Sequence, residues 1–221
     1  MPSDRWVVGI TGASGTVYAR RLIRAVVERL PEVALDVIVT PAAIRVMHDE
    51  EGLVLTGSRL TVESLTGMSG NAFRDQPRVA IHSPRNIGAG AASGSYRAAG
   101  MVIVPCSMKT LAAIAHGYAD NLLTRAADVT LKEGRKLVIV PRETPLSAIH
   151  LENMLRLARF GAAIVPAMPG FYHRPATVAD IVDMMVMRIL DQMGYRLDLT
   201  ERWPRSSASR RDEPIAEVSR A

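Results

Sequence analysis

Polar side chains recur at five places where a short apolar run of the sequence ends. Such runs predict buried parallel strands, and the ligands of open parallel sheets lie beyond the carboxyl ends of the strands. Together the five places predict a ligand site at one edge of a sheet. Each place also has a simpler explanation when it is taken alone. Ser107 or Thr110 could cap a helix, and Arg142 and Glu143 could form an ion pair at the surface. The five places are Ser14, Thr40, the string CSMKT (106–110), the string RET (142–144) and the string FYHR (171–174).

The string VVGITGASGTVYARRLIRAV (7–26) indicates a strand, a glycine-rich turn and a helix. Ser14 and the N–H groups at the start of that helix can donate to a phosphate, which the helix dipole also favours. A dinucleotide site needs an acidic residue at the end of the second strand, but this chain has Thr40 at that position. The nearest acidic residue, Asp36, lies too early, inside the strand. No tyrosine has a lysine four residues on, as short-chain dehydrogenases require. The turn therefore predicts a mononucleotide phosphate, with a plain tight turn as the alternative.

The last helical stretch, DIVDMMVMRILDQM, is almost wholly apolar between Asp183 and Asp191, apart from Arg188. This pattern predicts a helix that is buried on nearly all sides. A buried, unpaired arginine is costly, so Arg188 needs an anion. That anion is either an acidic side chain or a second phosphate or acidic substrate.

The single cysteine, Cys106, excludes a disulfide framework, and no histidine stands near it in the sequence. We therefore expect Cys106 to be a small packed residue and not a nucleophile. The histidines show no metal-ligand spacing, so no metal is expected. They are His48, His82, His116, His150 and His173.

The composition is that of an ordinary globular protein, with 221 residues, 48% apolar and 22% charged. No apolar run is long enough to cross a membrane, and the N-terminal residues lack the features of a signal peptide, so we expect a cytoplasmic protein. The net charge is +5, but aromatic residues make up only 5% and do not alternate with basic ones. Nucleic-acid binding is therefore not expected.

Strand-like and helix-like stretches alternate along the chain. The alternation predicts an α/β fold with a three-layer, open parallel sheet in a single domain, 1–203, followed by a disordered tail, 204–221. Ser147 and Thr177 are the expected N-caps of the last two helices. The expected strands are 6–10, 34–40, 78–82, 100–107, 136–141 and 162–170. The expected helices are 15–30, 41–51, 61–66, 108–117, 121–134, 147–161 and 177–194.

Four strings together resemble the flavin prenyltransferases of the UbiX/Pad type, and the resemblance covers nearly all of 5–203. The resemblance implies a flavodoxin-like (Rossmann-like) sheet that binds FMN, in a dodecamer whose sites lie between subunits. It also implies the reaction: reduced FMN is alkylated at N5 by dimethylallyl phosphate, without a metal, and a second bond closes at C6. The product would serve a UbiD-type aromatic-acid decarboxylase. The strings are GITGASG, SGSYRAAGMVIVPCSMKTLAAIAHGYADNLLTRAADVTLKE, VPRETPLSAIHLENM and PGFYHRP.

The same resemblance implies roles for individual residues. Glu50 would handle a proton, and Trp203 would pack over the reacting prenyl group. The prenyl phosphate would meet Lys132, Glu143, Tyr172 and Arg188, with Arg125 close by. The positions that would contact FMN are Gly12, Ala13, Ser14, Thr40, Ser107, Met108, Lys109, Thr110 and Arg142.

Two alternatives remain open. Flavin-dependent cysteine decarboxylases are similar, but they carry a histidine in the helix after the first turn, where this chain reads TVYARRLIRAV. They also carry a PASANT turn in place of PCSMKT. The other alternative is a non-catalytic, FMN-binding accessory subunit of a decarboxylase.

Overall fold

The fold is described by a computed structural model, which covers residues 4–55, 60–68 and 78–203. Six strands form one parallel sheet in the order β3-β2-β1-β4-β5-β6, so the predicted α/β class is confirmed. The expected tail, 204–221, lies outside the described residues. The strands are β1 (Arg5–Ile10), β2 (Ala34–Val39), β3 (Val79–His82), β4 (Gly100–Cys106), β5 (Lys136–Pro141) and β6 (Ala163–Ile164). The helices are α1 (Thr16–Arg29), α2 (Pro41–Glu51), α3 (Val62–Thr66), α4 (Met108–Ala115), α5 (Leu122–Lys132), α6 (Ala148–Arg159) and α7 (Val178–Met193), with a short 3₁₀ turn at Gly90–Ala92.

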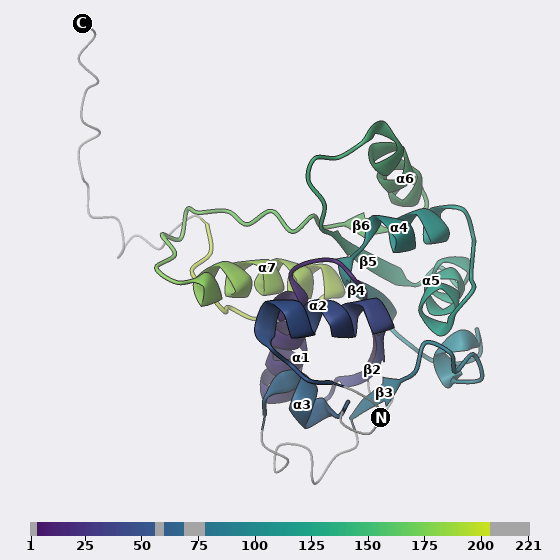
Figure 1. Cartoon of the computed structure of the whole chain (residues 1–221), viewed down its shortest axis with the longest axis horizontal. Coiled ribbons are helices and arrows are strands. Elements are labelled where there is room, and N and C mark those ends of the chain that lie inside the picture. Colours follow the sequence, from purple (N-terminus) through teal and green to yellow (C-terminus); the bar gives the residue numbers. More distant parts are fainter. Residues whose placement is uncertain (1–3, 56–59, 69–77, 204–221) are drawn as a thin grey trace, which may run out of the picture.

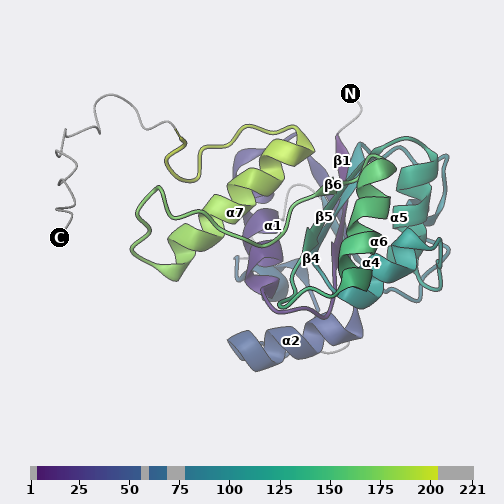
Figure 2. The same ribbon diagram turned by 90° about the horizontal axis from the view of Figure 1, so that it is seen from above.

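The sheet is the middle of three layers (Figure 1). Helices α1 and α7 cover one face and α4, α5 and α6 cover the other, as the view from above shows (Figure 2). Successive strand residues serve opposite faces: Val8 packs under α1 and α7, whereas Val7 packs under α4 and α5. Helix α2 lies across the end of the sheet at which β1 and β2 finish (Figure 2). That carboxyl edge is therefore flanked by three helices, α1, α2 and α4.

Local sequence signals set the helix ends. Ser147 accepts a hydrogen bond from the N–H of His150, and Thr177 accepts one from the N–H of Asp180, so both predicted N-caps are confirmed. Helix α7 ends at Gly194, whose φ of 94° is in the left-handed region that favours glycine. These ends depend on residues a few positions apart, which explains why the sequence predicts them.

The last strand is shorter than predicted. It spans Ala163–Ile164 instead of 162–170. Hydrogen bonds to β5 nevertheless continue beyond it, because the N–H of Val165 donates to the carbonyl of Ile139 at 2.8 Å and that of Ala167 to the carbonyl of Pro141 at 3.1 Å. Pro166, between them, has no N–H group to donate. In the described part of the chain no helix is long and apolar enough to cross a membrane.

Asp36 is the centre of a buried polar cluster on β2, and only 2% of its surface is exposed. Its carboxylate accepts hydrogen bonds from Tyr96 Oη at 2.6 Å and Arg5 Nη1 at 3.4 Å, and it contacts His82 Nε2 at 2.8 Å. Burial, and then the Asp36 carboxylate, raise the pKa of Tyr96 to about 12, so its hydroxyl stays a donor. The cluster ties β1, β2, β3 and the loop before β4 together.

Replacing Asp36 with alanine should destabilise the fold, because it leaves the donors around this carboxylate without their acceptor. We expect the free energy of unfolding to fall by about 3 kcal/mol, measured by urea denaturation. Asp49→Ala is the matched control, since Asp49 pairs with Arg45 at the surface and should leave the transition midpoint in place. Equal midpoints for the two variants would contradict the assigned role of the cluster.

Candidate active site

Hydrogen bonds join the ends of four neighbouring strands at the carboxyl edge. The N–H of Thr40 donates to the carbonyl of Ile10 at 3.1 Å, which joins the end of β2 to β1. The N–H of Arg142 donates to the carbonyl of Cys106 at 3.3 Å, which joins β5 to β4. Between them, the N–H of Thr11 donates to the carbonyl of Pro105 at 3.3 Å. The structure therefore brings together the residues that the sequence analysis placed at this edge, from the turn after β1 to Arg142.

Glycines allow the turn after β1 to lie tightly against α2. A Cβ atom at Gly12 would come within 2.4 Å of the Ala42 side chain, so a larger residue there would push α2 away. Gly15 has a φ of 93° and begins α1 without a side-chain cap. Its N–H donates instead to Oε2 of Glu50 at 3.1 Å. The exposed Ser14 therefore stands next to a carboxylate that reaches across from the end of α2.

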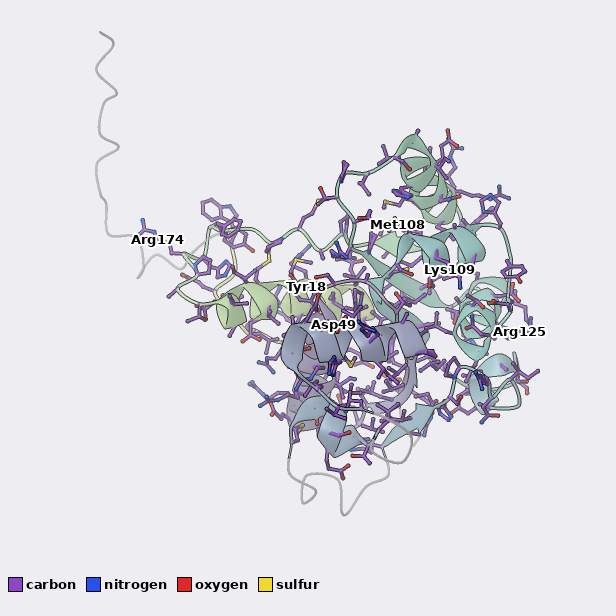
Figure 3. All side chains as sticks on the ribbon, viewed as in Figure 1. Tyr18, Asp49, Met108, Lys109, Arg125 and Arg174 are labelled. Atoms are coloured by element: carbon purple, nitrogen blue, oxygen red, sulfur yellow. The ribbon has the colours of Figure 1, made fainter. Side chains whose placement is uncertain are left out.

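The start of α4 offers donors that the helix itself does not use. Ser107 caps it: its Oγ accepts from the N–H of Thr110 at 3.4 Å and donates to the Thr110 hydroxyl at 3.1 Å. The N–H groups of Met108 and Lys109 have no acceptor within the helix, because the first turn never provides one. Figure 3 shows both residues at the beginning of α4. Free amides, hydroxyls and a lysine at a helix N-terminus form a site for an anion.

Arg142 follows β5 and lies beside that helix start. Its Nε atom is buried and has no hydrogen-bond partner among the described residues. Glu143 does not pair with it; that carboxylate accepts from the N–H of Thr144 at 3.0 Å. The alternative of an Arg142–Glu143 surface ion pair is therefore wrong. A buried guanidinium nitrogen without a protein acceptor is available to an atom of a ligand or to an ordered water.

The residues expected around the prenyl phosphate do not all meet within one chain. On α5, Arg125 pairs with Asp128 at 2.6 Å, and Lys132 Nζ lies 2.6 Å from Glu133 Oε1. Tyr172 belongs to the turn 171–174, which ends in Arg174. Figure 3 shows Arg125 and Arg174 at opposite sides of the molecule. The α5 residues and the Tyr172 turn are therefore separate parts of any such site.

Tyr172 and Trp203 do come together. Their ring centroids lie 6.0 Å apart with an interplanar angle of 68°, an edge-to-face contact. The neighbouring residue, Arg202, forms a bidentate ion pair with Asp191 on α7 and so holds Trp203 near this position. The last described residues thus fold back over the helix and place Trp203 against Tyr172 of the FYHR string.

Arg188 is not buried, and in this respect the prediction for the last helix is wrong. Its side chain is 49% exposed, and its Nη1 lies 2.8 Å from Asp191 Oδ2. Helix α7 packs on α1 and β5 through a broad apolar stripe, but a narrow outer stripe remains in solvent. Counting apolar residues along the sequence does not reveal that stripe. The alternative of an acidic side-chain partner is confirmed.

Two residues near this edge escaped the sequence analysis. Thr11 is 1% exposed, and its hydroxyl donates to the carbonyl of Pro105 near the end of β4. Its only signal in the sequence is a hydroxyl between a buried strand and a glycine turn. Glu51 accepts from the Thr16 hydroxyl at 3.0 Å and forms an ion pair with Arg20. Asp36, which comes too early in β2 to meet a ribose, is held within the sheet by its own donors.

Cys106 is fully buried at the end of β4, and burial raises the pKa of its thiol. The expectation of a packed cysteine is confirmed, and a buried thiol with a raised pKa is a poor nucleophile. Among the described residues no cluster of three histidine, cysteine, aspartate or glutamate side chains could hold a metal ion.

Cys106 should therefore react with a disulfide reagent such as Ellman's reagent only when the protein unfolds. We expect the colour to appear at the rate of unfolding in native buffer and immediately in denaturant. Because the chain has one cysteine, Cys106→Ser provides a blank. Fast reaction of the folded protein would show that the thiol is accessible.

Comparison with known proteins agrees with this geometry. The family model described as "Flavoprotein" matches residues 1–190. The flavin prenyltransferase UbiX of Alkalihalophilus pseudofirmus is 48% identical over 197 residues, which are 89% of this chain and 94% of the relative. The dodecameric FMN-dependent UbiX-like decarboxylase of Escherichia coli O157:H7 superposes with a TM-score of 0.77 at 45% identity, covering 90% of this chain and 98% of that one. AnUbiX (PadA1), solved in complex with FMN and dimethylallyl pyrophosphate, gives a TM-score of 0.78 at 40% identity over 90% and 97%. The chain is therefore a flavoprotein and belongs to the UbiX-like flavin prenyltransferase family.

Proposed function

We propose that this protein is a flavin prenyltransferase that joins a dimethylallyl group from dimethylallyl phosphate to N5 and C6 of reduced FMN. The observation that carries the proposal is the unpartnered Nε of Arg142 beside the free N-terminus of α4. A flavin mononucleotide fits both features, because its phosphate accepts from helix amides and hydroxyls and its ring has acceptors for a guanidinium. The 48% identity to a flavin prenyltransferase supports the same reaction.

The residues of the chain can be given roles in this reaction. Bound reduced FMN supplies the nucleophilic atoms N5 and C6. Lys132 and Arg188, with the hydroxyl of Tyr172, stabilise the charge that develops on the leaving phosphate. The exposed ring of Trp203, edge-on to Tyr172, offers an aromatic face to an allylic cation. When the ring closes, C6 bonds to one carbon of the prenyl double bond, the other alkene carbon gains a proton, and C6 loses one. Glu50, whose carboxylate already lies at the turn after β1, supplies the first proton and takes up the second.

The active enzyme is a homo-oligomer, and we propose a dodecamer. Within one chain, the α5 residues and the Tyr172 turn lie on opposite sides, so neighbouring copies must complete the prenyl-phosphate site. The related E. coli protein is dodecameric, which supports this arrangement. The prenylated flavin leaves the protein and serves as cofactor of a UbiD-type aromatic-acid decarboxylase.

The direct test supplies reduced FMN and dimethylallyl phosphate to the purified protein without oxygen and weighs the released flavin. We expect a flavin that is heavier by one five-carbon unit. Dimethylallyl pyrophosphate, the ligand seen with AnUbiX, is tested in parallel to identify the donor. Unchanged FMN with both donors would overturn the proposal, and would favour an accessory subunit. Loss of carbon dioxide from a cysteine substrate would favour a cysteine decarboxylase.

Arg188→Ala should slow prenyl transfer far more than it weakens FMN binding, because the guanidinium acts on the leaving phosphate. We expect the turnover rate to fall about a hundredfold while FMN affinity stays near that of the wild type. Arg45→Ala is the matched control, since it removes another exposed arginine paired with an aspartate on its own helix. Equal losses of turnover and FMN affinity in Arg188→Ala would place this residue outside the donor site.

A further inference from the structure

Thr11 connects the two turns that the flavin would occupy. Its hydroxyl donates to the carbonyl of Pro105 at 2.8 Å and accepts from the N–H of Ser107 at 2.8 Å. The side chain is 1% exposed, so water does not compete for these bonds. One hydroxyl group thus bridges β1 and β4, the neighbouring strands at which the chain order of the sheet reverses. Ligands of open parallel sheets bind at this position.

The bridge has a direct effect on the donors of α4. Because the N–H of Ser107 is engaged by Thr11, it is not free for a ligand. The same bond fixes where Ser107 stands, and Ser107 in turn orients Thr110 through its Oγ. The amides of Met108 and Lys109 therefore belong to a helix start that the hydroxyl of Thr11 ties to the end of β1.

We propose that Thr11 is a positioning residue of the flavin site, which holds the turn 12–15 and the start of α4 at the separation that the FMN phosphate requires. Charge-assisted hydrogen bonds to a phosphate depend on donors placed within a fraction of an ångström, so loosening the two turns weakens them most. The proposal rests on flavin binding and not on prenyl transfer. Its failure is thus separate from the failure of the proposed reaction.

The test compares FMN with riboflavin, which has the same ring system without the phosphate. Thr11→Val keeps the size of the side chain but removes both hydrogen bonds. We expect its preference for FMN over riboflavin to fall about tenfold, or ~1.4 kcal/mol, in titrations of flavin fluorescence. Thr11→Ser keeps the hydroxyl and should keep the wild-type preference.

Thr130→Val is the matched control, because Thr130 is also buried and its hydroxyl donates to the Ala126 carbonyl within α5, at 2.7 Å. It should leave the preference unchanged. The proposal would be overturned if a folded Thr11→Val protein kept the wild-type ratio of FMN affinity to riboflavin affinity. This holds whether both affinities are unchanged or both fall by the same factor.

Amide hydrogen exchange of the flavin-free wild type provides a second measurement that needs no variant. The bridge predicts strong protection of the Ser107 amide, although it is the first residue before a helix and lies outside the helical ladder. Exchange of this amide at the rate of an open turn would overturn the proposal, even if Thr11→Val failed to fold.

Discussion

The common direction of the six strands is the constraint on which the site depends. Because all strands are parallel, each junction from a strand to the next helix falls on the same edge of the sheet. Helices α1 and α4 leave that edge toward opposite faces, and α2 lies across it (Figure 2). The N-termini of these helices therefore surround the ends of β1 and β4 as a direct result of the strand directions. The hydroxyl of Thr11 and the close approach at Gly12 then set the remaining distances.

The sequence predicts features that depend on residues close together in the chain, such as helix caps and strand ends. It does not predict features that depend on tertiary packing. Ser147 and Thr177 cap helices because of residues three positions away, and the edge position of Thr40, Ser107 and Arg142 follows from the strand pattern alone. The exposure of Arg188 depends on which side of α7 faces α1, which no count of apolar residues reveals. The role of Thr11 depends on Pro105, 94 residues further along the chain. The roles expected of Lys132 and Tyr172 follow from the family resemblance and not from the pattern of residues.

The described chain leaves large apolar side chains in solvent around the Tyr172 turn. Phe171 is 64% exposed, Trp203 69% and Val178 74%. Exposed apolar side chains that gather on one surface favour its contact with another molecule. Copies of this chain that pack there would shield the aromatic pair from water and bring the lysine and arginine of a neighbour's α5 closer to it. Assembly and catalysis would then depend on the same residues.

Asp191 is shared by two arginines, and this sharing lowers the cost of freeing one of them. Arg202 holds both carboxylate oxygens at 2.9 Å, while Arg188 contacts only Oδ2. If Arg188 turns toward an anion, the carboxylate of Asp191 stays paired with Arg202 and is not left without a counter-charge. Moving the half-exposed guanidinium of Arg188 away from Asp191 therefore costs little electrostatic free energy.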